Sequence, residues 1–358
     1  MVFIFLNFIF LIGLLSYYII FSRIRISSFD LENNSFNEGV SVIICAKNEL
    51  KNIKTFFPSW INQEYSNFEI IIVNDQSIDG SFEYLNDLEK QYPKLRVLHI
   101  SKNETKVLKG KRHALLFGIQ NATNNYILLT DADCEPNSKF WITEMTKAFA
   151  NKKIKIVLGF SPYFRENTFL NKLIQYETFL TALQYLGWAN IGKPYMSVGR
   201  NVAYKKSILT PKSFTDSNKS ISGDDDLVFQ QIAKSENVAY NISQNAWVFS
   251  LPPKFWKEWF FQKKRHLSAG VFYSLQTKVF LGVFIILNFL FFIFSTALLV
   301  KNPITGLAFY ISKYQFFSIL LNKSKLLNIN FKNFIKYYTI IDIIYWLFYS
   351  IFALALTQ

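Results

Sequence analysis

The chain contains very little cysteine, with Cys45 and Cys134 as the two cysteines in 358 residues. Both lie within apolar strand-like or turn-like segments, and their spacing is not that of a cysteine metal site. A disulfide-stabilised secreted fold is therefore not expected, and a reducing compartment is the simplest interpretation. The hydrophobic content of 51% also excludes a disordered chain, and it allows one globular domain plus several further apolar segments.

Acidic residues are outnumbered by basic ones, which gives a formal net charge of +14. Nucleic acid, acidic phospholipid or a phosphorylated substrate would each balance that charge. The lysines and arginines are spread through the polar half and gather beside apolar segments, whereas nucleic-acid binders tend to form one dense basic stripe with interleaved aromatics. We therefore expect a membrane surface and phosphate groups as partners, and no nucleic acid.

Charge is absent from residues 1–21, a stretch long enough to cross a hydrocarbon core as a helix. Arg23 and Arg25 follow at once. A cleavable signal peptide would carry basic residues before the apolar run and a small-residue cleavage site after it, and this segment shows neither. It is predicted to be a transmembrane signal anchor, with residue 22 onward in the cytosol.

The end of the chain is again apolar. Residues 254–270 mix aromatic and basic side chains, which predicts an amphipathic interfacial segment. Membrane helices are predicted at 279–300, 304–321 and 337–356. Lys313 weakens the second of these, and Asp342 in the third must face protein. Lysines are more numerous between the second and third helices than between the first and second, which agrees with the orientation of the anchor. The sequence thus predicts a multi-pass protein of the inner (cytoplasmic) cell membrane.

Residues 38–250 alternate short β-branched runs with amphipathic, helix-like stretches. The clearest runs are 40–45, 69–73, 95–100, 126–130 and 154–159. Strands this apolar are typical of a mostly parallel sheet covered by helices on both faces. The fold class is therefore predicted as α/β, with a cytosolic domain of Rossmann-like topology.

Acidic residues directly follow several of these runs. Glu49 comes after the first, Asp75 after the second, and Asp131 and Asp133 after the fourth. Ligands of open α/β sheets bind beyond the carboxyl ends of the strands, so these carboxylates are expected at one edge. Such an all-oxygen group suits Mg²⁺ or Mn²⁺, with a nucleotide diphosphate as the further ligand. Each residue taken alone could instead cap a helix or form a turn.

Three stretches together resemble glycosyltransferase family 2, namely residues 40–49, residues 72–80 and Asp131-Ala132-Asp133. The resemblance extends over roughly residues 38–270 and includes the Gly-Lys and Ala-Leu pairs of residues 109–115. It implies a GT-A fold and a nucleotide-sugar donor, with Asp133 as the chief metal ligand. The residues that it implies for donor binding are Glu49, Asp75, Lys111 and Asp131. Read without the family, the lysines near residue 110 could simply solvate a helix end.

A run of three aspartates opens a predicted helix near residue 226. It matches the motif that supplies the catalytic base of the family, which implies that Asp225 removes the proton from the acceptor hydroxyl and that Asp224 lies nearby. The same aspartates could instead cap the helix. Gly199-Arg200-Asn201 resembles a family loop near the acceptor, and it is equally well explained as a structural turn.

Residues 262–266, Gln-Lys-Lys-Arg-His, resemble the Gln-x-x-Arg-Trp signature of membrane-associated members. The resemblance implies that Arg265 pairs with the departing diphosphate, for which its planar donors are suited. Gln262 and His266 are implied as further contacts. His266 replaces the signature tryptophan, which leaves the acceptor and any processive chain growth open. Without the family, the stretch is a basic helix whose Lys263 and Lys264 bind anionic lipid.

The resemblance implies an inverting hexosyltransferase that uses a nucleotide sugar, with a UDP-linked donor favoured and a lipid or growing glycan as acceptor. A processive polysaccharide synthase is an alternative that would need the C-terminal helices to form a channel. A nucleotidyltransferase should show a glycine-rich phosphate loop after the first strand, where residues 46–49 read Ala-Lys-Asn-Glu. A non-catalytic membrane scaffold is disfavoured, because the sequence retains the motif residues Asp75, Asp133, Asp225 and Arg265.

Overall fold

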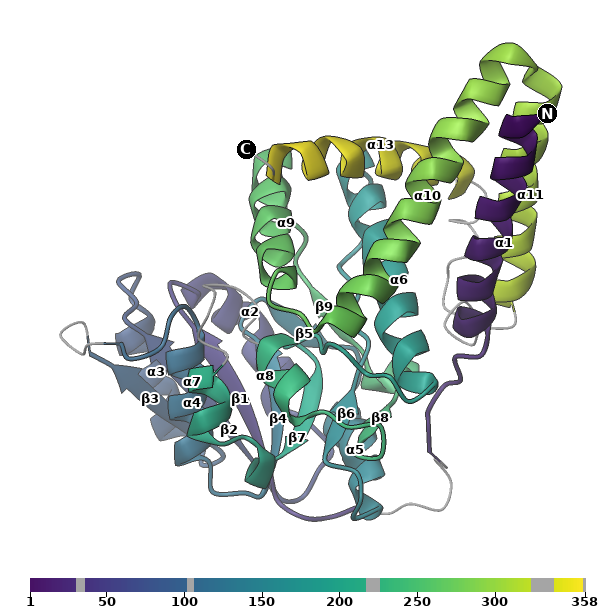
Figure 1. The fold of residues 1–358 in the computed structure, drawn as a ribbon. Helices are drawn as coiled ribbons and strands as arrows, with labels where there is room; N and C mark the ends of the chain where they lie inside the picture. The colour runs from purple at the N-terminus through teal and green to yellow at the C-terminus, as the bar shows by residue number, and fades with distance from the viewer. Residues whose placement is uncertain (30–35, 102–105, 217–225, 323–337, 357–358) are drawn as a thin grey trace. The chain divides into compact units, whose positions relative to one another are not determined.

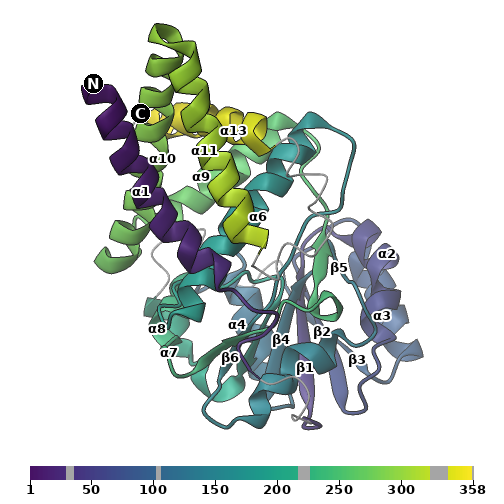
Figure 2. The ribbon, with the colours of Figure 1, turned by 90° about the vertical axis from the view of Figure 1, so that its right-hand side faces the viewer.

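The structure is a computed structural model, and it describes residues 1–29, 36–101, 106–216, 226–322 and 338–356. The chain forms two compact units, both drawn in Figures 1 and 2. One unit consists of Ile26–Phe164 and Gly192–Pro253, and the other of Met1–Arg25, Arg165–Ile191 and Lys254–Gln358. The segment 165–191, which lies inside the predicted domain 38–250, therefore groups with the two ends of the chain.

The first of these units is built on a seven-stranded sheet within the described residues, in the order β3-β2-β1-β4-β7-β6-β8. Its strands are β1 (Val40–Ala46), β2 (Phe68–Asp75), β3 (Leu95–Ile100), β4 (Tyr126–Asp131), β6 (Ile156–Leu158), β7 (Val202–Lys205) and β8 (Val238–Tyr240). Strands β1 to β4 pair in parallel, and β7 is antiparallel to both neighbours. The predicted α/β class with a mostly parallel sheet is confirmed. A short antiparallel pair, β5 (Cys134–Pro136) and β9 (Val248–Ser250), lies outside it.

The helices of this unit pack on both faces of the sheet (Figure 2), which buries the apolar side chains of its central strands. They are α2 (Leu50–Ile61), α3 (Ser81–Gln91), α4 (Arg112–Asn121), α5 (Trp141–Thr146), α7 (Pro211–Asp216) and α8 (Asp226–Ile232), with 3₁₀ turns at Lys147–Ala150, Lys206–Ile208 and Gln244–Ala246. In α2 the spacing of Ile53, Phe56 and Trp60 puts three buried side chains on one face, as the sequence predicts. At Gly118 of α4 an added Cβ would come within 2.8 Å of Ile43, so the missing side chain permits close helix–strand packing.

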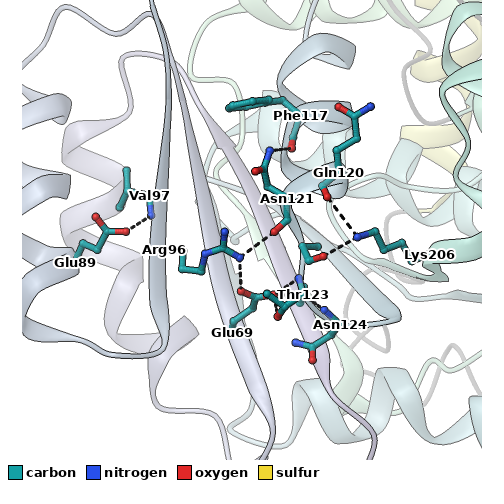
Figure 3. A network of polar contacts seen from close by, with 12 residues as sticks. Glu69, Glu89, Arg96, Val97, Phe117, Gln120, Asn121, Thr123, Asn124 and Lys206 are labelled. Carbon is teal, nitrogen blue, oxygen red and sulfur yellow. Dashed lines mark hydrogen bonds and ion pairs between the residues drawn. The ribbon is translucent and has the colours of Figure 1, made fainter.

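Glu69 joins the amino ends of the parallel strands to the segment after α4 (Figure 3). Its buried carboxylate accepts hydrogen bonds from Ser41 Oγ at 2.6 Å and from the Thr123 backbone N–H at 2.7 Å. Arg96 donates to Glu69 at 3.1 Å and to the Asn121 carbonyl at 2.9 Å, which satisfies one of the last carbonyls of α4. Burial raises the pKa of Glu69, but these hydrogen bonds outweigh it and the net pKa is lowered. The network therefore fixes the start of β4, the strand that ends in Asp131.

The other unit is helical within the described residues. Its helices are α1 (Val2–Ser22), α6 (Phe169–Asn190), α9 (Trp256–Gly270), α10 (Leu275–Lys301), α11 (Pro303–Asn322) and α13 (Tyr338–Leu356). By length and composition, α1 and α10 are the two described helices that could cross a membrane. They coincide with the predicted anchor 1–21 and the predicted helix 279–300. The lysines expected between the last two helices lie outside the described residues.

Helix α6 was not predicted from the sequence. Thr168 caps its start, accepting a hydrogen bond from the Asn171 backbone N–H at 3.1 Å. Most of its apolar side chains are buried, including those of Leu173, Phe179 and Leu183. Polar residues occur on several sides of the helix, so neither a clean amphipathic stripe nor an uninterrupted apolar run marks it in the sequence.

Lys313 and Asp342, the two charges that weaken the predicted C-terminal spans, are buried and bonded to each other at 2.6 Å. Lys313 of α11 also donates to Asn288 Oδ1 of α10 at 3.0 Å. Asp342 of α13 accepts hydrogen bonds from Tyr176 of α6 at 2.6 Å and from Trp346 at 3.0 Å. Four helices thus share one polar network, and Asp342 faces protein as its charge requires.

Candidate active site

The candidate site forms where β1, β2 and β4 end. Parallel pairing aligns Ala46 with Asn74 and Cys45 with Asp131, so the residues that follow these strands emerge at one edge of the sheet. Asp75 is the last residue of β2 and Asp131 the last of β4. The strand order therefore brings together carboxylates that lie far apart in the sequence.

Asp131, Asp133 and the thiol of Cys134 have ligand atoms within 4.8 Å of one another. We call Asp131 and Asp133 the acidic cluster. Burial raises the pKa of Asp133, and the neighbouring charge of Asp131 raises it further. The two carboxylates thus repel each other in a partly buried position, which is where a bound cation has the largest effect.

Cys134 was assigned no role from the sequence. Burial raises the pKa of its thiol well above the usual value, so the thiol stays protonated. Its Sγ donates to Asp133 Oδ1 at 3.2 Å, and Ser250 Oγ lies 3.4 Å from Asp133 Oδ2. A protonated thiol is a poor ligand for a hard cation, whereas carboxylate oxygens suit Mg²⁺ or Mn²⁺. The donors of the acidic cluster therefore fit the predicted metal, with Cys134 orienting Asp133.

Glu49 lies at the same edge, immediately before α2. Asn52 donates to its Oε2 at 2.6 Å. Burial raises the pKa of Glu49, and the charges of Asp133 and Asp131 raise it further, although the Asn52 hydrogen bond opposes them. Glu49 therefore belongs to the same electrostatic environment as the acidic cluster, as its predicted position required.

Two lysines from the segment between β3 and α4 reach the strand ends. Lys111 forms an ion pair with Asp131, and Lys106 forms one with Asp75 at 2.6 Å. Lys106 was not singled out from the sequence, because that segment contains several lysines and no pattern distinguishes them. Lys109, another of the lysines near residue 110, is exposed. The ion pairs hold cationic groups beside the carboxylates.

Arg200 is fixed by the strand-end segment that follows β6. Its guanidinium donates to Ser161 Oγ at 2.8 Å and to Tyr163 Oη at 3.1 Å, and it lies 4.4 Å from the centroid of the Tyr163 ring. Its positive charge opposes, but does not outweigh, the rise in the pKa of Asp133 that burial and Asp131 cause. The neighbouring Asn201 is fully buried, and its side-chain oxygen accepts a hydrogen bond from Trp141 Nε1 at 3.0 Å. The interpretation of this segment as a structural turn therefore holds for Asn201, whereas Arg200 lies beside the acidic cluster.

The loops that carry Glu49 and Asp75 are braced against each other, through residues that sequence reasoning did not identify. Asn48 adopts a left-handed backbone with φ of 58°. Its N–H donates to Ser77 Oγ at 2.9 Å, and its side-chain oxygen accepts from the Ile78 N–H at 2.8 Å. A positive φ at a non-glycine residue cannot be read from a single sequence, although asparagine tolerates it better than most residues.

Residues 41–209 match the sequence model of "Glycosyl transferase family 2". The matched residues make up just under half of the chain, and over them the chain is similar to glycosyl transferase family 2. Its resemblance to that family is therefore confirmed, and the paired loops, the acidic cluster and the lysines before α4 all lie within the matched residues.

The relatives that this chain resembles are matched over only part of their own length. The chain is 28% identical over 151 residues to the poly-beta-1,6-N-acetyl-D-glucosamine synthase of Staphylococcus epidermidis, which is 41% of this chain and 35% of the relative. It is 29% identical over 135 residues to the Escherichia coli UDP-Glc:alpha-D-GlcNAc-diphosphoundecaprenol beta-1,3-glucosyltransferase WfaP, which is 37% of this chain and 49% of the relative. The chain thus spans half or less of these relatives.

The fold itself is shared with a solved structure, the mannosyltransferase PcManGT from Pyrobaculum calidifontis in complex with GDP-Man and Mn2+. The two structures superpose with a TM-score of 0.59 at 16% sequence identity, covering 94% of this chain and 92% of the other. At this identity the comparison shows a common fold, which agrees with the predicted GT-A architecture.

The other residues implied by the family 2 resemblance lie in the helical unit or outside the described residues. Asp224 and Asp225 lie outside the described residues, and α8 begins at the next position, Asp226. Gln262, Arg265 and His266 lie on α9, in the helical unit. Gln262 is partly buried, while Arg265 and His266 are exposed. The roles given to all of these residues remain predictions.

Proposed function

We propose that the chain is an inverting glycosyltransferase that moves a sugar from a nucleotide-diphosphate sugar to a lipid or membrane-associated glycan. The observation that carries the proposal is the acidic cluster at the ends of parallel strands, with Glu49 and two lysines beside it, in a chain similar to family 2. A UDP-linked donor is favoured because one relative, the glucosyltransferase WfaP, is named for the donor UDP-Glc.

Asp131 and Asp133 would hold Mn²⁺ or Mg²⁺, with Asp133 as the chief ligand. When bound, the ion offsets the charge that develops on the departing diphosphate. Glu49 and Asp75 bind the nucleoside part of the donor. Lys111, which is paired with Asp131 in this structure, also reaches the diphosphate.

Asp225 accepts the proton of the acceptor hydroxyl as that oxygen attacks the anomeric carbon, and the bond to the diphosphate breaks on the opposite side. Direct displacement of this kind inverts the anomeric carbon. Arg265 donates to the leaving diphosphate, for which a planar guanidinium is better suited than a lysine. Arg200 keeps a fixed positive charge beside Asp133.

We also propose that α1, α10, α11 and α13 span the inner cell membrane and that the sheet unit is cytosolic. Support comes from the length and apolarity of α1 and α10 and from the buried pairing of the charges on α11 and α13. Cysteine-accessibility labelling of intact cells tests the orientation. Labelling of cysteines introduced at exposed positions of α2 or α3 from the outside of intact cells would contradict it.

The decisive experiment supplies radiolabelled UDP-sugars and Mn²⁺ to membranes containing the full chain and separates lipid from polymer products. We expect label in the lipid or short-glycan fraction. A long polymer would favour the alternative of a processive synthase, the activity named for one relative. Label in neither fraction, with every nucleotide sugar tried, would contradict glycosyl transfer.

A further inference from the structure

The two adjacent lysines of α9 have different environments. Lys263 Nζ lies 2.6 Å from the carboxylate of Glu177 on α6, and their side chains are only 17% and 12% exposed. Lys264, the next residue, is exposed. The expectation that both lysines bind anionic lipid is therefore wrong for Lys263, because its ammonium group is engaged inside the helical unit.

Trp259 reinforces the same contact. Its side chain is 2% exposed, and its Nε1 donates to Glu177 Oε2 at 3.2 Å. Trp259 and Lys263 are four residues apart and so lie on one face of α9. A single carboxylate on α6 thus holds two side chains, one helical turn apart, on α9.

This double contact fixes the rotation of α9 about its own axis. At 3.6 residues per turn, Arg265 lies about 160° around the helix from Lys263. Arg265 is accordingly exposed, while Lys263 faces α6. Gln262 lies between them on the helix surface and is partly buried. Rotating α9 by one residue would bury Lys264 against Glu177 and reorient Arg265.

Both ends of the contact are anchored. On α6, Tyr176 precedes Glu177 and donates to Asp342 of α13 at 2.6 Å. On α9, Trp256 stacks on Phe348 of α13 with ring centroids 5.3 Å apart. Helix α6 therefore offers Glu177 from a fixed position, and α9 is bound at two points along its length.

We propose that Glu177 is a positioning residue for sugar transfer. Through Lys263 and Trp259 it sets the rotation of α9 and thereby the side of that helix on which Arg265 lies. This inference rests on the proposed function, in which Arg265 stabilises the leaving group. In this proposal Lys263, inside the Gln-x-x-Arg motif, orients the helix, and Arg265 stabilises the leaving group.

The test uses the full chain in membranes with the variants Glu177→Gln and Lys263→Met, and with Lys264→Met as the matched control. We expect the first two to lower kcat about tenfold or more, since small displacements of a positioned group are costly. The donor KM should change less than twofold, because donor binding is assigned to the sheet unit. Lys264→Met should match the wild type, and the exchanged pair E177K/K263E should recover part of kcat.

A second readout is independent of turnover. The variant Arg265→Cys is treated with a maleimide, and the rate of labelling at position 265 is measured with and without Glu177→Gln. Mass spectrometry distinguishes this label from labels on Cys45 and Cys134. We expect Glu177→Gln to change the labelling rate and Lys264→Met to leave it unchanged.

The outcomes separate the two proposals. A wild-type chain without any transfer contradicts the proposed function, while the labelling rate still decides whether Glu177 sets the helix. If the wild type is active, a normal kcat in the Glu177 and Lys263 variants together with unchanged labelling in Glu177→Gln overturns the positioning role alone. A lowered melting temperature with unchanged kcat would also overturn it, because the contact would then serve only stability.

Discussion

Individual residues of the acidic cluster differ in how their charge is balanced. Asp131 has a direct cationic partner in Lys111, whereas Asp133 has a thiol, a distant hydroxyl and the nearby charge of Arg200. Asp133 is therefore the carboxylate that gains most from a cation. This difference supports the assignment of Asp133, rather than Asp131, as the chief metal ligand.

Asp133→Asn should reduce the transfer rate by at least about 100-fold, because under the proposed function it removes the main anionic ligand of the ion that stabilises the leaving group. Initial rates with a UDP-sugar, measured across a Mn²⁺ titration, check this. Asp87→Asn serves as the control, since Asp87 forms an exposed pair with Lys90. An Asp133→Asn protein that needs no more Mn²⁺ than the wild type would exclude Asp133 as the ligand.

Asn48 allows backbone strain to be separated from side-chain bonding. Asn48→Gly keeps the left-handed backbone but removes the acceptor of the Ile78 N–H, and Asn48→Ala also introduces about 1 kcal/mol of strain. Both variants should raise the donor KM, and Asn48→Ala should also lower the melting temperature. Thr55→Ala on α2, whose hydroxyl donates to the Lys51 carbonyl of the same helix, is the control. Equal KM values in all four proteins would show that the loop brace does not position Glu49 or Asp75.

At the scale of secondary structure, the sequence predicted the elements whose pattern is local. The β3 strand lies at the predicted residues 95–100, and β4 extends the predicted run 126–130 by one residue. Strand β4 is buried on both faces of the sheet, and this burial produces an apolar run that needs no tertiary information to be recognised. Helix α6 could not be predicted from the sequence because its burial depends on partners from both ends of the chain. The pairing of Lys263 with Glu177 could not be predicted for the same reason.

The Glu69 network predicts an effect of pH on the stability of the sheet unit. Because the pKa of Glu69 is lower in the folded than in the unfolded chain, its stabilisation is complete above the unfolded value, 4.5, and is lost as the pH falls through the folded value. Glu69→Gln should cost about 2 kcal/mol near pH 7 and progressively less below pH 4.5.

Melting temperatures of the wild type and Glu69→Gln at a series of pH values check this. The difference between the two proteins should be largest at neutral pH and should narrow in acid. Glu83→Gln, at an exposed position in the first turn of α3, is the control and should melt like the wild type throughout. A constant difference across the series would mean that the ionised carboxylate contributes nothing.

At the scale of the whole molecule, each unit is assembled from separated parts of the sequence. Composition indicated a polar middle and apolar ends, which is enough to predict a membrane-associated α/β protein. It could not indicate that 165–191 joins the terminal helices, or that the charges weakening two predicted spans neutralise each other. Those facts depend on which helices are neighbours, and neighbours are set by tertiary packing.

The pair of Lys313 and Asp342 should control assembly of the helical unit. Lys313→Met leaves a buried carboxylate without its cation, which costs about 3–5 kcal/mol in comparable buried pairs. We therefore expect this variant to accumulate poorly in membranes and to melt at a lower temperature. The double variant K313M/D342N removes both charges but leaves an acceptor for Tyr176, so it should recover most of the loss.

Quantitative blots of membrane fractions and melting curves of the solubilised protein distinguish these cases. Lys301→Met, at the exposed end of α10, controls for the loss of a lysine near the membrane. If the double variant were as damaged as Lys313→Met, the hydrogen bond from Lys313 to Asn288 would have to matter more than the charge pair. If Lys313→Met behaved like Lys301→Met, the buried charges would be dispensable, and α11 and α13 would have to associate through apolar packing alone.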